Sequence, residues 1–171
     1  MTALATSSAR VGVTAHATSS ARAGVTALEQ SAATSPFSFT LRVYWEDTDA
    51  GGVVFYANYL KFFERARTEW LRALGLGQQQ LRDDTGAIFI VTDTTLRFLL
   101  PAKLDDLLRV TVQPVETGRA SMRLAQQAWR DNAGDAAPSL LCEGQIRIAC
   151  VDAARFAPRR FPLQITQALS P

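Results

Sequence analysis

The chain has 171 residues and a mass of 18.7 kDa; 47% of the residues are hydrophobic and 20% are charged, which predicts one globular domain. Charged or amide side chains interrupt every hydrophobic run before it reaches the ~18 apolar residues of a membrane-spanning helix, so a transmembrane protein is excluded. The formal net charge is only +2 and the charges are scattered singly, which argues against nucleic-acid binding.

The N-terminal segment differs in composition from the rest of the chain. It consists mainly of Ala, Thr, Ser and Gly and contains a near-exact duplication, ATSSARVGVTA at 5–15 and ATSSARAGVTA at 17–27. Such a segment has too little large apolar surface to fold, so we expect residues 1–35 to be a disordered, low-complexity extension, with a targeting peptide as the alternative. We expect the folded domain at 36–165, followed by a C-terminal tail at 166–171.

Histidine and cysteine usage restricts the possible chemistry. The single histidine, His16, lies in the N-terminal extension, so the folded part has no imidazole for a Ser-His-Asp triad, a Cys-His pair or a His-ligated metal. Cys142 and Cys150 are predicted to share one strand face about 26 Å apart, too far for a disulfide. Buried free thiols suit a reducing compartment. Catalysis must therefore use carboxylates, hydroxyls, amines or backbone dipoles.

A strand and a helix are predicted at the start of the domain. Apolar residues alternate with polar ones over 38–45, where Phe39, Leu41, Val43 and Trp45 share one strand face. A loop rich in Asp and Gly follows at 46–55. Helical spacing of apolar residues then predicts a helix over 57–74, ended by Gly75. Its apolar face carries four aromatic rings, as expected for a helix packed on a sheet.

Period-two patterns return in the second half of the domain. They predict four antiparallel strands, at about 87–100, 106–116, 119–130 and 139–151. Pro114 within one of these strands indicates a sheet edge or a bulge. The order of elements predicts an α+β fold in which one long helix packs on one sheet. A single helix covers only one face, so we expect the sheet to meet another subunit in a dimer or tetramer.

The loop before the long helix carries the candidate chemistry. Glu46, Asp47 and Asp49 precede the Gly51-Gly52 pair, which lets the backbone approach a ligand closely. The helix N-terminus just downstream presents unpaired N–H groups and a positive dipole end. A carboxylate opposite such donors is suited to acyl transfer.

Each of these residues also has a structural interpretation. Asp49 in this sequence is a natural turn former, and Glu46 and Asp47 are expected in a solvated loop. Tyr56 and Tyr59 also fit a role as core aromatics. The remaining acid, Glu64, also fits a helix-surface ion pair with Arg65 or Arg67.

The segment 43–70, VYWEDTDAGGVVFYANYLKFFERARTEW, resembles the hotdog-fold acyl-CoA thioesterases of the 4-hydroxybenzoyl-CoA thioesterase family. It is most similar to the Tol-Pal-associated, YbgC-type branch, with its V-x-Y-x-D-T-D-A-x-G-V-V run followed by F-x-E-x-A-R-T-E. The resemblance continues through LRFLLPAKLDD and ends near Pro162, covering about three quarters of the chain. It implies a curved five-stranded antiparallel sheet wrapped around one long central helix, homodimers or homotetramers with active sites between subunits, and no metal or other cofactor.

The resemblance also implies roles for particular residues. The catalytic carboxylate of the family matches Asp49, and the backbone N–H that polarises the thioester carbonyl matches Tyr56, where several members of the branch have His. Asn58 and Tyr59 are candidates to line the acyl pocket, and Arg119 to contact a CoA phosphate. The candidate substrate-binding residues as a set are Gly51, Gly52, Asn58, Tyr59, Glu64 and Arg119.

We therefore predict a bacterial, cytoplasmic acyl-CoA thioesterase that favours short or medium acyl chains. Asp49 acts either as a nucleophile or as a general base, and the residues do not separate these routes. The main alternative is a non-catalytic scaffold that binds acyl carrier protein or Tol-Pal-associated envelope partners. A dehydratase or hydratase is disfavoured because that chemistry normally requires a histidine beside the acid. Acyl-CoA is the expected substrate, with acyl carrier protein as a possible partner.

Overall fold

The computed structural model describes residues 35–132 and 136–169, so His16 and nearly all of the expected N-terminal extension lie outside the described residues. The elements in chain order are β1 (Phe37–Arg42), the 3-10 turn η1 (Trp45–Asp47), α1 (Asn58–Ala73), α2 (Gln78–Thr85), β2 (Ala87–Phe98), β3 (Leu107–Thr117), β4 (Ser121–Arg130), β5 (Ser139–Asp152) and α3 (Leu163–Ala168). The helix α3 crosses the domain boundary expected at 165, and that boundary stays a prediction.

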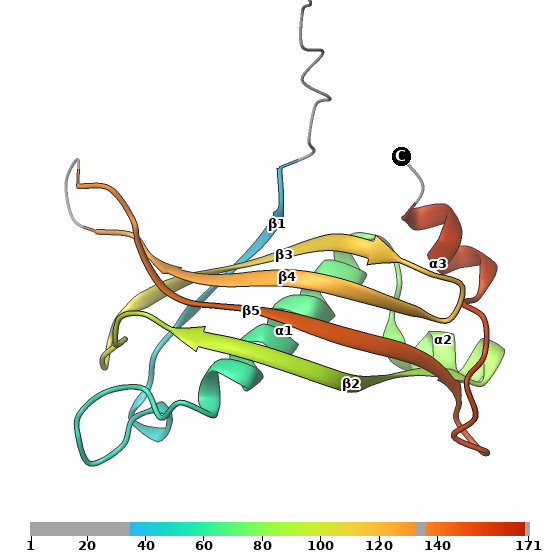
Figure 1. The fold of residues 1–171 in the computed structure, drawn as a ribbon, viewed down its shortest axis with the longest axis horizontal. Coiled ribbons are helices and arrows are strands. Elements are labelled where there is room, and N and C mark those ends of the chain that lie inside the picture. Colours follow the sequence, from blue (N-terminus) through green and yellow to red (C-terminus); the bar gives the residue numbers. More distant parts are fainter. Residues whose placement is uncertain (1–34, 133–135, 170–171) are drawn as a thin grey trace, which may run out of the picture. The chain divides into compact units, whose positions relative to one another are not determined.

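The strands described form one antiparallel sheet of five strands in the order β1-β3-β4-β5-β2 (Figure 1). The helix α1 lies across one face of this sheet and packs against β1, β3 and β4. The expected α+β fold with a five-stranded antiparallel sheet is confirmed. Its two edge strands are β1 and β2, and β2 is the longer, with 12 residues against 6.

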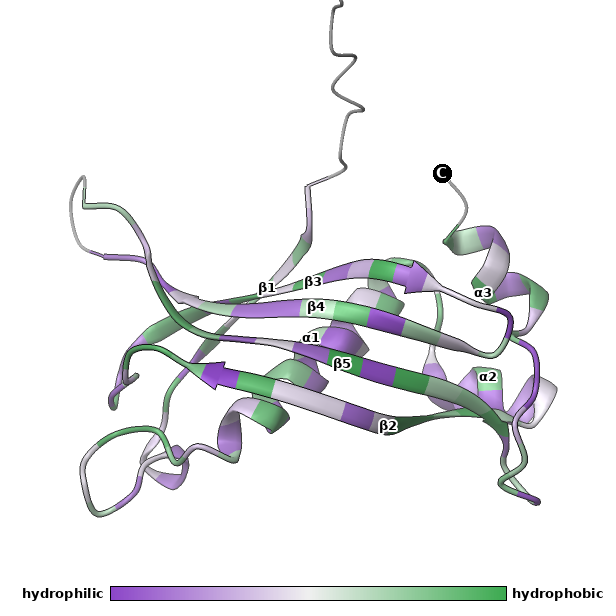
Figure 2. Ribbon diagram, in the orientation of Figure 1, coloured by the Kyte–Doolittle hydropathy of each residue, from purple (hydrophilic) through white to green (hydrophobic). Residues whose placement is uncertain are grey.

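The core forms between α1 and the inner face of the sheet. On β4 every second residue is buried, and bands of hydrophobic and hydrophilic residues alternate along the strands in Figure 2. The apolar stripe of α1 faces this surface, with Phe62 and Phe63 fully buried. Burial of these rings holds α1 against the sheet, so the start of α1 has a defined position.

A buried polar contact also joins α1 to the sheet. The Gln126 side chain on β4 is fully buried; its Nε2 donates to the Phe63 carbonyl oxygen at 3.1 Å, and its Oε1 accepts from Arg67 Nη1 at 2.8 Å. Burial lowers the pKa of Arg67 below its ordinary value, with the nearby Glu64 carboxylate acting in the opposite direction. These hydrogen bonds satisfy polar groups that burial would otherwise penalise.

The first predicted strand is too long. Trp45 was expected on its buried face, but β1 ends at Arg42 and Trp45 begins η1 with 79% of its surface exposed. The chain turns because the Tyr44 N–H donates to Asp47 Oδ2 at 2.9 Å instead of continuing a ladder. Local side-chain bonding of this kind competes with strand pairing and leaves no period-two signature.

Helix α2 was not predicted from the sequence. Its segment, QQQLRDDT, buries only Leu81 and so lacks an apolar stripe. Its C-cap is Gly86 in the left-handed conformation, with φ 68°.

The expectations for Pro114 and the cysteines hold: the register of β3 against β4 shifts between Pro114 and Glu116, and both thiols are free, buried and on β5.

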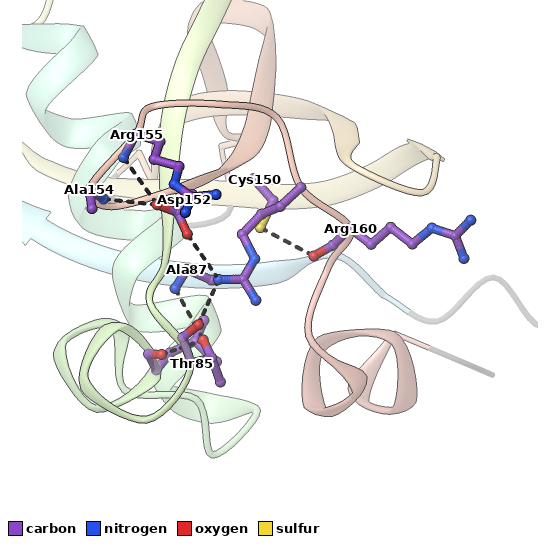
Figure 3. Close-up of polar contacts among 9 residues, drawn as sticks. Thr85, Ala87, Cys150, Asp152, Ala154, Arg155 and Arg160 are labelled. Atoms are coloured by element: carbon purple, nitrogen blue, oxygen red, sulfur yellow. Dashed lines mark hydrogen bonds and ion pairs between the residues drawn. The ribbon is translucent and has the colours of Figure 1, made fainter.

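The segment after β5 is tied back to the end of α2 by polar contacts (Figure 3). Arg159 Nη1 donates to the Thr85 carbonyl oxygen at 2.6 Å and lies 3.8 Å from Asp152 Oδ2. The other oxygen of that carboxylate accepts the N–H groups of Ala154 and Arg155 at 3.1 and 3.0 Å. These contacts hold the turn that follows β5.

Candidate active site

The loop between β1 and α1 forms a small hairpin at the start of α1 (Figure 1). Thr48 and Val54 pair as an antiparallel bridge, and the Asp49 N–H donates to the Val53 carbonyl oxygen at 2.9 Å. The Val54 N–H donates to the carbonyl oxygen of Ala102 at 2.9 Å. The hairpin is therefore attached both to α1 and to the segment that follows β2.

Asp49 lies in the turn of this hairpin and is exposed. Its Oδ1 accepts the Gly51 N–H at 2.8 Å, and its carbonyl oxygen accepts the Gly52 N–H at 2.9 Å. A Cβ on Gly51 would approach Oδ1 to 3.1 Å, and Gly52 has φ +73°, so both positions favour glycine. Among the described residues, the second carboxylate oxygen has no hydrogen-bond partner. One oxygen thus builds the turn while the other stays available for chemistry.

Asp47 does not lie in a solvated loop as expected: it is only 3% exposed. Its carboxylate accepts the Tyr44 N–H at 2.9 Å. Its carbonyl oxygen accepts both the Phe55 N–H and Asn58 Nδ2, each at 2.9 Å. The neighbouring Glu46 is exposed, as predicted. The sequence pattern did not separate these two acids, because the partners of Asp47 are backbone and amide groups.

At the start of α1, two backbone N–H groups have no partner among the described residues. The Phe55 N–H is used by Asp47, and the Asn58 N–H donates to the Phe55 carbonyl oxygen at 2.8 Å. Across residues 35–132 and 136–169 no hydrogen bond is made by the N–H of Tyr56 or of Ala57. Unsatisfied N–H groups at a helix start attract an oxygen that gains negative charge. Donors of this kind can stabilise the oxyanion that forms in acyl transfer.

An apolar cavity of about 290 Å³ opens beside these donors. Its lining consists of Val53, Val54, Tyr56, Tyr59, Phe98, Leu99, Leu100 and Pro101. The ring centroids of Tyr56 and Phe98 lie 6.3 Å apart in an edge-on arrangement, and those of Tyr59 and Phe98 lie 5.6 Å apart. The cavity therefore joins the helix start to the end of β2, and its surface suits an apolar group.

Tyr59 forms an inner part of this cavity. It is 3% exposed, and its hydroxyl oxygen accepts the Ala102 N–H at 3.3 Å. Burial raises the pKa of Tyr59 above its ordinary value, although this hydrogen bond acts in the opposite direction. The phenol is therefore neutral at physiological pH and is no general base.

Three predicted site residues take other positions. Asn58 is buried, is not among the residues that line the cavity, and points its amide nitrogen at the Asp47 carbonyl oxygen. Glu64 is exposed on α1 and accepts a hydrogen bond from Thr68 Oγ1 at 2.7 Å, instead of pairing with an arginine. Arg119 lies in the β3–β4 hairpin, at the other end of the sheet, roughly 30 Å along β3 from the loop.

A larger cleft of about 610 Å³ lies over β2, β4 and β5. Its polar lining includes Gln127, Gln145 and the ion-paired Arg97 and Glu143. The Glu143 carboxylate is ion-paired with the arginine, and the β4 and β5 parts of the lining come from strands that are paired on both sides. The carboxylate in this cleft is ion-paired, whereas among the described residues that of Asp49 is not, and the cleft contains no helix start.

The described residues contain no cluster of three or more His, Cys, Asp or Glu side chains able to hold a metal ion. None of the helices described is long and apolar enough to cross a membrane.

Comparison with known proteins assigns the chain to a family. The family model described as the thioesterase superfamily matches residues 51–137. The chain belongs to the thioesterase superfamily. This assignment confirms the resemblance predicted from the loop and the long helix, and the match begins within the Asp- and Gly-rich loop.

Within the thioesterase superfamily, the chain is 42% identical over 132 residues to the acyl-CoA thioesterase YbgC of Haemophilus influenzae, covering 77% of this chain and 93% of that protein. It is 40% identical to the acyl-CoA thioester hydrolase YbgC of Escherichia coli O157:H7, with 77% and 94% covered. A probable thioesterase from Bartonella henselae of known structure has 32% identity and a TM-score of 0.63, over 74% of this chain and 98% of that one.

The fold is also shared by a more distant thioesterase. A 4-hydroxybenzoyl-CoA thioesterase mutant, solved with 4-hydroxybenzoyl-CoA, has a TM-score of 0.73 at 20% identity, over 78% of this chain and 98% of that one. At this identity the similarity concerns the fold alone.

Proposed function

We propose that the protein is an acyl-CoA thioesterase, which hydrolyses the thioester to a carboxylate and free CoA. The observation that carries this proposal is that one loop holds a carboxylate with a free oxygen, on Asp49, and a free backbone N–H, on Tyr56. The two groups that acyl transfer needs are a base or nucleophile and an oxyanion donor. Membership of the thioesterase superfamily and the names of the YbgC relatives support the choice of substrate.

The mechanism starts with the thioester carbonyl oxygen on the Tyr56 N–H. In one route the Asp49 carboxylate attacks the carbonyl carbon, the C–S bond breaks, and water then hydrolyses the resulting anhydride. In the other route the Asp49 carboxylate takes a proton from a water whose oxygen attacks the same carbon. Both routes place negative charge on the carbonyl oxygen, where the N–H stabilises it. Both release CoA as a thiolate, a good leaving group that needs no strong general acid.

The acyl group is proposed to enter the apolar cavity beside Tyr56. A volume of about 290 Å³ and an apolar lining favour short or medium chains. The turn glycines, Gly51 and Gly52, allow the backbone of the Asp49 turn to lie close to the substrate. Acyl carrier protein as an alternative donor stays a prediction.

We also propose a homodimer or homotetramer. The long edge strand β2 has no partner on its outer side in the described chain, and Val91 and Phe98 on it are 50% and 47% exposed. An exposed apolar edge of this length is usually covered by another chain. Arg119 lies at the far end of the sheet from Asp49, so the expected contact with a CoA phosphate requires the arginine of another subunit.

Thiol release from a panel of acyl-CoAs and acyl carrier protein thioesters tests the proposal, with wild type compared with Asp49→Asn. The amide retains an oxygen that accepts the Gly51 N–H, so the turn persists while the nucleophile or base is lost. We expect a loss of about 100-fold or more in kcat, the size of general-base catalysis. Glu46→Gln, an exposed acid of the same loop, is the matched control and should keep wild-type activity.

Two results would reject the proposal: no thiol release by the wild type from any thioester, or equal activity of wild type and Asp49→Asn. Either result would favour the non-catalytic scaffold. Circular dichroism and gel filtration on each variant establish that the fold and the assembly are unchanged.

A further inference from the structure

Asn58 occupies an unusual position for a polar side chain. It is the first residue of α1, it is 5% exposed, and its Nδ2 donates to the Asp47 carbonyl oxygen at 2.9 Å. The same carbonyl oxygen accepts the Phe55 N–H at 2.9 Å. One oxygen therefore receives two donors, both from residues 55–58 at the start of α1.

This shared oxygen joins the two segments that carry the proposed chemistry. Asp47 lies two residues before Asp49, and Phe55 lies immediately before Tyr56. Asp47 is held on its other side as well, because its carboxylate accepts the Tyr44 N–H at 2.9 Å. A displacement of the Asp47 carbonyl would move the Asp49 turn relative to the free N–H of Tyr56.

We infer that Asn58 is a positioning residue for thioester hydrolysis, whose side-chain amide sets the separation between the Asp49 carboxylate and the Tyr56 N–H. The inference rests on the proposed function of these two groups. The apolar lining of the acyl cavity does not include Asn58, so its contribution is to geometry and not to acyl binding.

The geometry predicts which kinetic constant should change when the Asn58 amide is lost. Attack on the carbonyl carbon requires the carboxylate or its water and the oxyanion donor to be aligned on one substrate, and an error of about 1 Å in such alignment can cost about 100-fold in rate. Binding of the acyl group depends on the cavity residues, which Asn58 does not touch through a hydrogen bond. Loss of the amide donor should therefore lower kcat and leave KM nearly unchanged.

Asn58→Asp tests the inference, because it keeps the shape of the side chain but replaces the donor by a carboxylate facing the Asp47 carbonyl oxygen. At neutral pH we expect kcat to fall about 10- to 100-fold with KM within about 2-fold of wild type. Asn132→Asp is the matched control: this amide also donates to a backbone carbonyl oxygen, that of Ala137, but lies in the β4–β5 connection. It should keep wild-type kcat.

A pH series supplies a readout that a purely structural role would not move. The introduced carboxyl group is buried, so its pKa lies above that of an exposed aspartate. When protonated, the group has an O–H that can donate to the Asp47 carbonyl oxygen. The ratio of variant to wild-type kcat should therefore rise as the pH falls, while the ratio for Asn132→Asp stays constant.

Several outcomes would overturn the inference. One is a kcat for Asn58→Asp equal to wild type at every pH; another is a loss fully explained by a smaller folded fraction in thermal melts. If Asn58→Asp does not fold, Asn58→Ser replaces it, and the same result is expected: a lower kcat with a nearly unchanged KM. If the wild type releases no thiol, or Asp49→Asn is fully active, the proposed function fails and this inference fails with it. If the wild type releases thiol and Asp49→Asn is inactive, but Asn58→Asp has wild-type kcat, only the inference about Asn58 is rejected.

Discussion

The backbone N–H of Tyr56 can be removed without removing any hydrogen bond in the described part of the chain. Proline at this position has no N–H, and in the described part of the chain that N–H has no partner. Because Tyr56→Pro also removes the phenol ring, the informative comparison is with Tyr56→Ala, which loses the ring and keeps the N–H. The difference between the two variants isolates the proposed oxyanion donor.

The expected size of this difference follows from the geometry of the loop. The neighbouring N–H groups of Phe55 and Asn58 are occupied by the carbonyl oxygens of Asp47 and Phe55, so in the described chain only the adjacent Ala57 N–H is also free. Loss of one oxyanion donor typically costs about 100- to 1,000-fold in kcat, or ~3–4 kcal/mol of transition-state stabilisation. We expect Tyr56→Pro to be slower than Tyr56→Ala by this factor, with similar KM values.

The assay is thiol release from the best acyl-CoA of the panel, measured at saturating substrate for wild type, Tyr56→Ala and Tyr56→Pro. Thermal melts test whether proline disturbs the start of α1. Ala57→Pro removes the second free N–H and keeps that of Tyr56, at a residue whose φ of −70° suits proline; it should keep wild-type kcat if the Tyr56 N–H is the donor. Equal kcat values for the proline and alanine variants at Tyr56, with both folded, would refute the oxyanion assignment.

Three further predictions concern stability. Phe62 is a fully buried residue of α1, and Phe62→Ala should lower the free energy of unfolding, measured by urea titration, by about 3–5 kcal/mol. Leu60 on the same helix is 42% exposed, and Leu60→Ala should lower it by less than about 1 kcal/mol. Gly144→Ala should lower the free energy of unfolding by about 1–3 kcal/mol, because its Cβ would come within 2.6 Å of the Thr95 carbonyl oxygen on β2. Gly77→Ala is the control, since its Cβ would have its nearest contact at 3.8 Å. Equal urea midpoints for the two variants would contradict the steric argument. Burial raises the pKa of Cys142 from 9.0 to about 12. Between these two pH values only the thiol of the unfolded chain ionises, so the free energy of unfolding should be unaffected by this group below pH 9 and should decrease as the pH rises toward 12. A Cys142→Ala protein with the same decrease would disprove the assignment.

The long helix and most of the sheet were predictable from the sequence because their patterns are local and periodic. The expected helix at 57–74 corresponds to α1, Asn58–Ala73, and the expected strands at 119–130 and 139–151 correspond closely to β4 and β5. Helix α2 was missed because a short, polar helix with one buried residue has no such pattern. Pairing order and register lay beyond periodicity, because they depend on contacts between distant segments.

The sequence by itself placed the only histidine outside the expected domain, which leaves carboxylates, hydroxyls, amines or backbone dipoles for catalysis, and it indicated the loop with Asp49 and Tyr56 as the candidate site. The burial of Asp47, its hydrogen bond with Asn58 and the position of the cavity between the loop and Phe98 were decided by the tertiary structure alone. These features are hydrogen bonds and packing contacts between segments up to tens of residues apart. Residue identity shows that a side chain can donate or accept, but only the folded chain determines which partner comes within reach.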